Sequence, residues 1–297
     1  MRIALIQKLT VGLLALWCVA ASGASIGAPS CGALGPAMPA RDARSPAAHQ
    51  FAGELLDMGE PARDLAIRRE LLAGNIPGFL RALQPVSMDG VVAGLGAVHV
   101  TLCVLADYLS VGSDDDFLRV PMGLETAQRV AATFGAILPT RRMVDAIYRQ
   151  AAVHLTPLPL PAGDQMRSTD YYRAHNALVQ QQRDALGAPP QALTSGQKKD
   201  LVLSARLWRD PGRVAIYGWH RGVGDPIQPL STVHGARYAD YSHGVRLVSN
   251  VAYVNGVARS IFELLEDPSW AAVLSDEGPL PGAAGLFGAL ADAGRRD

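Results

Sequence analysis

Apolar residues recur at helical spacing in the first part of the chain after residue 48. Between Phe51 and Leu83 they fall three or four positions apart, and the pattern breaks at 59–61 and again at 74–77. Such spacing places apolar side chains on one face of a helix, whereas the glycines and prolines at the breaks interrupt helices. The segment is therefore predicted to form two or three short helices.

The pattern changes after residue 85. Residues 86–92 and 96–109 are rich in β-branched side chains, and glycines interrupt the run. This composition predicts two strands, of which the second is long and largely buried. His99 lies on the second strand and is expected to be an ordinary core or edge histidine.

Helical spacing returns in the middle of the chain. It covers 124–138 and 140–152, which Pro139 separates, and Ser168 begins a typical cap for a further helix that reaches about Leu186. These segments predict three more helices, and the polar face of the last one either lines a cleft or is solvated.

A turn signal, Arg-Asp-Pro-Gly at 209–212, lies between strand-like residues 197–208 and 213–220. Proline and glycine supply the two torsions that a tight turn needs, so a hairpin is predicted here.

That hairpin would pair side chains across its two strands. If Asp210 lies opposite Arg213, then Arg206 faces Tyr217 on one side of the ribbon, which also carries Trp219. A guanidinium and aromatic face suits a sugar ring or a peptide, and its alternative is a second packed layer. His220 would lie at the rim of the opposite, core face.

A further strand is predicted from about Tyr241 to the Asn255-Gly256 turn. Because side chains alternate along a strand, Tyr241 and His243 share one face, and Ser242 and Arg246 share the other. Ser242 is then a poor nucleophile for His243. Asp240, on the side of Ser242, could join a polar cluster with Arg246.

Residues 242–256, SHGVRLVSNVAYVNG, resemble the strand of NlpC/P60-type cell-wall cysteine peptidases, in which a histidine opens a strand that ends in an asparagine-glycine turn. The nucleophilic cysteine of those enzymes stands at a helix start. Here Cys103 lies in an apolar strand and Cys31 in a leader. The resemblance therefore implies a similar strand and not that activity.

The pattern as a whole predicts one α+β domain over residues 49–278, an antiparallel sheet of hairpins packed with several helices. Residues 24–48 are rich in Ala, Gly, Pro and Ser and are predicted to be a flexible leader, and residues 279–297 a Gly- and Ala-rich tail. A chain of 297 residues with 49% hydrophobic residues is long enough to bury a sizeable core.

The N-terminus carries the features of a secretory signal over residues 1–23. Arg2 and Lys8 precede an apolar run, and Ala21-Ser22-Gly23 offers small residues for cleavage. The alternative is an uncleaved anchor, but the run is shorter than the roughly 20 residues of a membrane span. A secreted or periplasmic protein without a stable membrane span after cleavage is expected.

Charge and cysteine content narrow the picture further. The signal segment holds two of the 27 basic residues, so the rest of the chain, which holds all 27 acidic ones, has a net charge of about −2. Such a balance gives no footprint for binding nucleic acid. In an oxidising compartment Cys31 and Cys103 either form a disulfide, or Cys103 is a buried small hydrophobe.

The candidate chemistry is concentrated in residues 213–256, where three of the seven histidines lie. One alternative is a zinc site formed by His220, His234, Asp240 and His243, although the chain has no HExxH motif. A second needs no metal or other cofactor: His243 or His220 acts as acid or base, Asp240 orients it, and a nearby cation stabilises negative charge. A third is a purely structural role.

The leading hypothesis is an exported hydrolase of an extracellular polymer, peptidoglycan or polysaccharide, that uses His and Asp acid-base chemistry. Its alternative is a non-enzymatic secreted protein that binds a small ligand. The candidate catalytic residues are His243, Asp240, His220, Arg246, Lys199 and Arg206, and the candidate substrate-binding residues are Tyr217, Trp219, His234 and Tyr241.

Overall fold

The first helices form where the apolar spacing predicts them. The computed structural model describes residues 31–33 and 38–286, so the predicted signal segment lies outside the described residues. Helix α1 spans Ala48–Glu54, α2 spans Glu60–Leu72, and the 3-10 turn η1 spans Gly78–Leu80. Pro61 lies in the first turn of α2, where its missing N–H is tolerated. The break predicted at residues 59–61 is therefore the start of this helix.

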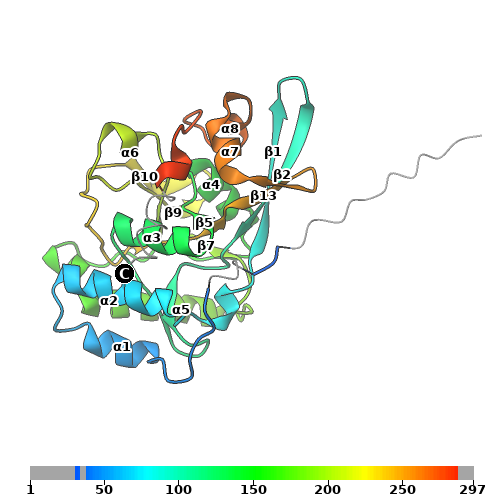
Figure 1. Ribbon diagram of the computed structural model, residues 1–297. Helices are drawn as coiled ribbons and strands as arrows, with labels where there is room; N and C mark the ends of the chain where they lie inside the picture. Colours follow the sequence, from blue (N-terminus) through cyan, green and yellow to red (C-terminus); the bar gives the residue numbers. More distant parts are fainter. Residues whose placement is uncertain (1–30, 34–37, 287–297) are drawn as a thin grey trace, which may run out of the picture.

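The two strands predicted after residue 85 form a hairpin of β1 (Gln84–Val92) and β2 (Gly96–Val104), which extends away from the body of the molecule (Figure 1). Their sheet has the order β14-β13-β2-β12-β5, with β1 paired to β2. The other strands are β5 (Ala136–Ile137), β12 (Val248–Ser249), β13 (Val251–Val254) and β14 (Val257–Ser260). Asn255 and Gly256 both have positive φ, as a tight turn between β13 and β14 requires.

A second sheet carries the residues of the candidate chemistry, in the order β10-β9-β8-β11. Its strands are β8 (Lys199–Leu201), β9 (Ile216–Gly222), β10 (Asp225–Ser231) and β11 (His243–Gly244). Strand β8 pairs antiparallel with β9 and parallel with β11. Three segments that are distant in the sequence therefore meet at Lys199.

The remaining elements surround these sheets. Two short strand pairs are β3 (Ser110–Gly112) with β4 (Phe117–Arg119) and β6 (Val153–His154) with β7 (Thr194–Ser195). The other helices are α3 (Leu124–Thr133), α4 (Arg141–Gln150), η2 (Asp164–Arg167), α5 (Thr169–Ala185), α6 (Arg206–Arg209), α7 (Ile261–Glu266) and α8 (Pro268–Leu274). Figure 1 shows α1, α2 and α5 at one end of the molecule and α7, α8 and the β1–β2 hairpin at the other. The predicted α+β class is confirmed.

The predicted hairpin around residues 209–212 is wrong. Residues 206–209 form α6, whose Leu207 is buried and whose first turn is closed by the Leu207 N–H donating to the Ser204 carbonyl. The strands do pair, but Asp200 lies opposite Tyr217. Local helix formation therefore removes residues 206–209 from the ribbon, and the tight hairpin is β9–β10 instead.

The single strand predicted from Tyr241 to the Asn255-Gly256 turn is also wrong. Its residues form β11, β12 and β13, which belong to two different sheets. The chain crosses between the sheets at Arg246, whose buried guanidinium donates to the carbonyls of Leu105 (2.7 Å) and Thr194 (2.6 Å). The similarity to a cell-wall peptidase strand is thus confined to a histidine at its start and a turn at its end.

Parts of the predicted leader and tail contact the domain. A disulfide joins Cys31 to Cys103 on β2. The Arg41 side chain donates to Asn75 Oδ1 (2.9 Å) and to the Gly112 carbonyl (3.1 Å), and Leu280 is buried. Within the described ranges, no helix is long and apolar enough to cross a bilayer.

Candidate active site

The parallel pairing of β11 with β8 places His243 directly beside Lys199. The Lys199 N–H donates to the Ser242 carbonyl at 2.8 Å, which fixes this register. Residues paired in a sheet direct their side chains to the same face, so the imidazole and the ammonium lie on one side of the sheet. Sheet pairing, not sequence proximity, brings these two groups together.

Asp240 lies in the loop just before β11. Its Oδ1 accepts hydrogen bonds from the Ser242 N–H (2.7 Å) and hydroxyl (2.5 Å), and its Oδ2 accepts one from the Tyr238 hydroxyl (3.2 Å). Burial alone would raise the pKa of Asp240, but the charge of His243, the Ser242 hydrogen bonds and Lys199 outweigh it and lower the pKa. Asp240 is therefore ionised at neutral pH. The hydroxyl of Ser242 is directed to this carboxylate, in keeping with its predicted unsuitability as a nucleophile.

His243 is fully buried, and neither ring nitrogen has a hydrogen-bond partner among the described residues. Its Nε2 lies 3.7 Å from Asp240 Oδ2, slightly beyond hydrogen-bond length. Burial lowers the pKa of His243 to about 4, although Asp240 partly offsets that effect. The ring is therefore neutral at pH 7 and can accept a proton.

Two aromatic side chains cover His243. The rings of His234 and Tyr238 are stacked with centroids 3.9 Å apart, and both are partly exposed. Their centroids lie 6.2 Å and 5.7 Å from that of His243. We call Lys199, His234, Tyr238, Asp240 and His243 the His243 cluster. It has a buried base and carboxylate below a partly exposed stack.

Trp219 joins the cluster to a second group of buried polar side chains. The Lys199 ammonium lies over the Trp219 ring, 5.2 Å from its centroid. Trp219 has φ of 58°, a left-handed conformation that is unfavourable for a bulky side chain and that is often found at functional sites. Its ring also approaches those of His175 and Tyr241, each at 6.4 Å.

We call His175, Lys198, Trp219 and Tyr241 the His175 group. The ring nitrogens of His175 and the indole N–H of Trp219 have no hydrogen-bond partner in the described part of the chain. The Lys198 ammonium donates to the Tyr241 carbonyl at 2.5 Å, and burial lowers its pKa to about 7. These buried polar atoms have a desolvation cost that packing alone does not explain.

The His175→Leu substitution is predicted to flatten the acid loss of stability. Burial lowers the pKa of His175 to about 2. A histidine in the unfolded chain titrates near pH 6.5. Below that pH the unfolded chain binds a proton at His175 and the folded protein does not. The free energy of unfolding therefore falls by about 1.4 kcal/mol for each unit by which the pH is lowered. Leucine has no such proton, so urea denaturation at about pH 7 and pH 4.5 should show the variant gaining about 2–3 kcal/mol on the wild type between these pH values.

The comparison isolates His175 because the other buried titratable groups are common to both proteins. His243 acts in the same direction as His175, whereas Asp200, whose pKa burial raises to about 6, acts in the opposite one. The exposed His99 provides the control, and His99→Leu should follow the wild type at both pH values. Equal pH dependence in His175→Leu and the wild type would contradict the prediction.

Several predicted site residues lie elsewhere. His220 Nε2 is 3.0 Å from Asp145 Oδ1, which also accepts a hydrogen bond from the Tyr217 hydroxyl (2.8 Å). Burial would raise the pKa of Asp145, but these two hydrogen bonds lower it. His220 and Tyr217 thus form a separate cluster with α4. Tyr217 and Trp219 are both buried, which agrees with the packed layer and not with the ligand-binding face.

The two candidate arginines also serve other parts of the fold. Arg206 donates to the Leu230 carbonyl at 3.0 Å and so ties α6 to β10. Arg246 is 0% exposed, stacks on Tyr108 at 4.4 Å, and its Nε lies 4.0 Å from Asp200 Oδ1. The predicted cluster of Arg246 with Asp240 and Ser242 is therefore wrong. Of the three proposed cations, Lys199, Arg206 and Arg246, only Lys199 lies beside His243.

A buried ionic network lies near Arg246. Asp107 is 0% exposed, and its Oδ2 accepts hydrogen bonds from Arg119 (3.0 and 2.7 Å) and Arg183 (3.2 Å). Its Oδ1 accepts one from Gln197 at 2.8 Å. Gln197 immediately precedes Lys198 and Lys199, and β8 begins at Lys199. The network therefore fixes the position of the backbone that carries these two lysines.

Sequence reasoning missed Tyr238, Lys198 and His175 as site residues. Tyr238 was recognisable because it stands two positions before Asp240 and can reach its carboxylate. His175 belongs to the helix whose polar face was predicted either to line a cleft or to be solvated, and Lys198 carried no signal. Only tertiary packing brings α5 against β9.

Neither a set of metal ligands nor a similarity to known proteins identifies the function of the site. Among the residues that the structure describes, no group of three or more His, Cys, Asp or Glu side chains is placed to hold a metal ion. His220, one of the proposed zinc ligands, is bound to Asp145 instead. No protein-family model, curated protein or solved structure matches the chain.

Proposed function

We propose that this protein is an exported hydrolase that cleaves an extracellular polymer, peptidoglycan or polysaccharide, by metal-free acid-base catalysis at the His243 cluster. One observation carries the proposal. A neutral, fully buried imidazole, neither of whose nitrogens has a hydrogen-bond partner in the described part of the chain, lies 3.7 Å from an ionised carboxylate. Perturbed titratable pairs of this kind are concentrated at catalytic sites.

The two ring nitrogens of His243 take different roles. Nε2 is the nitrogen that faces Asp240, so an Nε2–H directed at the carboxylate leaves the lone pair on Nδ1. Nδ1 can then take a proton from a water molecule as that water attacks the scissile bond, and return it to the leaving group. Asp240 orients the ring and stabilises its protonated form. Catalytic hydrogen bonds are often long before substrate binds, and 3.7 Å fits that behaviour.

Lys199 is the cation that would stabilise negative charge on the attacked group. It shares the sheet face of His243, and its ammonium is held over Trp219. A positioned ammonium in a site of low dielectric is well suited to an oxyanion. Because His234 and Tyr238 cover His243, substrate entry requires these two side chains to move aside, which makes the two rings the expected gate.

The disulfide supports export. Cys31 and Cys103 are bonded across 72 positions of sequence, and such bonds are typical of proteins in oxidising compartments. Together with the signal-like N-terminus, this bond favours a secreted or periplasmic location and hence an extracellular substrate.

The His243→Gln variant is expected to lose polymer hydrolysis by about 10²–10⁴-fold, because glutamine cannot act as the base. Glutamine fills a similar volume, so the thermal midpoint should stay within about 5 °C of the wild type. The measurement is release of reducing ends and soluble fragments from peptidoglycan sacculi and from a panel of polysaccharides. His99→Gln, at an exposed histidine, is the matched control and should keep full activity. Wild-type protein that forms no product from any of these polymers would refute the proposal.

The second candidate is a non-enzymatic secreted binding protein. It is favoured by a pocket of about 540 Å³ that includes no residue of the His243 cluster. Ligand binding that is unchanged in His243→Gln, without product from any polymer, would support this alternative.

A further inference from the structure

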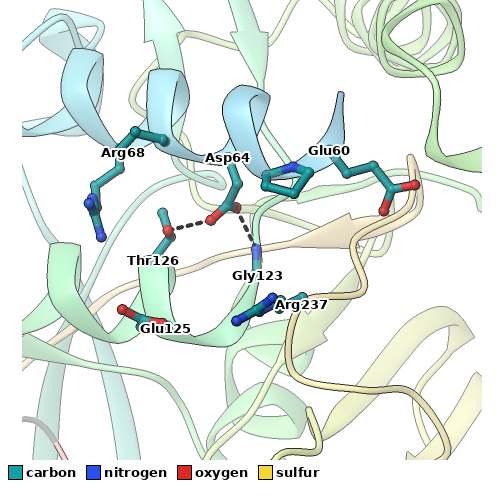
Figure 2. Close-up of a pocket in the computed structure, with 9 residues that line it drawn as sticks. Glu60, Asp64, Arg68, Gly123, Glu125, Thr126 and Arg237 are labelled. Carbon is teal, nitrogen blue, oxygen red and sulfur yellow. Dashed lines mark hydrogen bonds between the residues drawn. The ribbon is translucent and has the colours of Figure 1, made fainter. Parts of the chain in front are cut away.

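The pocket of about 540 Å³ has three walls (Figure 2). Helix α2 supplies one wall, the first turn of α3 supplies another, and Arg237 comes from the loop before Asp240. The Leu124 N–H donates to the Ala236 carbonyl at 2.7 Å, which holds this loop against α3. A Cβ on Gly123 would lie 3.2 Å from that carbonyl oxygen, so glycine permits the close approach. The pocket is therefore a built feature of the fold.

The carboxylates that line the pocket already have partners. Glu60 lies 2.9 Å from Arg167. Asp64 accepts hydrogen bonds from the Gly123 N–H (2.8 Å) and the Thr126 hydroxyl (2.5 Å), which Figure 2 shows as dashed lines. Glu125 is mostly exposed and lies 3.8 Å from Arg129. Glu60 is thus paired with an arginine outside the pocket, and the oxygens of Asp64 are directed at neutral donors of α3 and its N-cap.

The two guanidiniums of the pocket are not engaged in this way. Arg68 is half-buried and Arg237 is exposed, and neither has a hydrogen bond or ion pair with any described residue. Figure 2 shows Arg68 extending from α2 and Arg237 lying below Asp64, so they approach the pocket from different walls. Pro61 and Leu65 add apolar surface, and Leu65 is 53% exposed.

We propose that this pocket binds a small amphipathic carboxylate. The carboxylate would bind the Arg68 and Arg237 guanidiniums, whose planar N–H groups match its two oxygens. The apolar part would cover Pro61 and Leu65, since small-molecule sites combine apolar lining with a few placed polar groups. This inference does not depend on hydrolysis at the His243 cluster.

The test uses N-acetyl-leucine and N-acetyl-leucinamide, two probes that differ only in the carboxylate. Isothermal titration or ligand-observed NMR should give a millimolar Kd for the acid, the strength expected of a ligand this small, and binding at least about tenfold weaker for the amide. Arg68→Gln and Arg237→Gln should each weaken binding of the acid by about tenfold. Arg69→Gln, on the same helix but outside the pocket, should change the Kd by less than about twofold.

Equal affinity for acid and amide, no binding of the acid up to about 10 mM, or unchanged affinity in both arginine variants would overturn the proposal. His243→Gln separates it from the proposed catalysis. Acid binding should be the same in that variant as in the wild type, whether or not the wild type hydrolyses a polymer.

Discussion

Asp107→Asn is expected to lower the free energy of unfolding by about 3–5 kcal/mol, the usual effect of removing one partner from a buried ionic network. Asparagine keeps the shape of the side chain and an acceptor oxygen but removes the charge. Arg119 and Arg183, 1% and 4% exposed, would then be left buried beside a neutral group. Guanidiniums cannot deprotonate to relieve that cost. Urea denaturation at neutral pH measures the change.

Asp89→Asn is the matched control for this prediction. Asp89 Oδ1 also has a close partner, His99 Nδ1 at 2.7 Å. The Asp89 side chain, however, lies on the β1–β2 hairpin and is 83% exposed. Exposed pairs contribute about 0–1 kcal/mol, so the control should unfold almost as the wild type does. A loss of less than about 1 kcal/mol in Asp107→Asn would show that the network contributes little to the stability of the fold.

Elements with local signals were predictable from the sequence. The α1–α2 region followed from apolar spacing, and the tight turn after β13 followed from Asn255-Gly256, a dipeptide that favours the positive φ values found there. Ser168 caps α5 as predicted, since its side chain accepts the Tyr171 N–H. In each case the determining contacts lie within a few residues of one another.

Long-range pairing was not predictable in the same way. Strands β8 and β9 do pair, but the register that puts Lys199 opposite Gly218 is not set by a turn between them. The residues that connect them contain α6, and the Asp-Pro-Gly sequence forms a turn directly after that helix, in which the Arg213 N–H donates to the Asp210 carbonyl at 3.3 Å. Turn residues fix register only when the strands they join are adjacent in sequence.

The candidate site was predictable only in part, for the same reason. Strand alternation separates Ser242 from His243, but it does not say what lies across from either. Parallel pairing with β8 brings Lys199 to His243, whereas Arg246 turns toward the Leu105 and Thr194 carbonyls and His220 toward Asp145. Sequence alone could therefore not distinguish Lys199 from the other proposed cations.

Catalysis by His243 and Asp240 as one unit is the central claim, and a double-mutant cycle tests it most directly. The initial rates of polymer hydrolysis are measured for the wild type, His243→Gln, Asp240→Asn and the double variant, each first shown to be folded by thermal melting. Asp240 can act only through His243, so the double variant should be no more than about threefold slower than His243→Gln. Losses that multiply, or single variants that keep the wild-type rate, would contradict the claim.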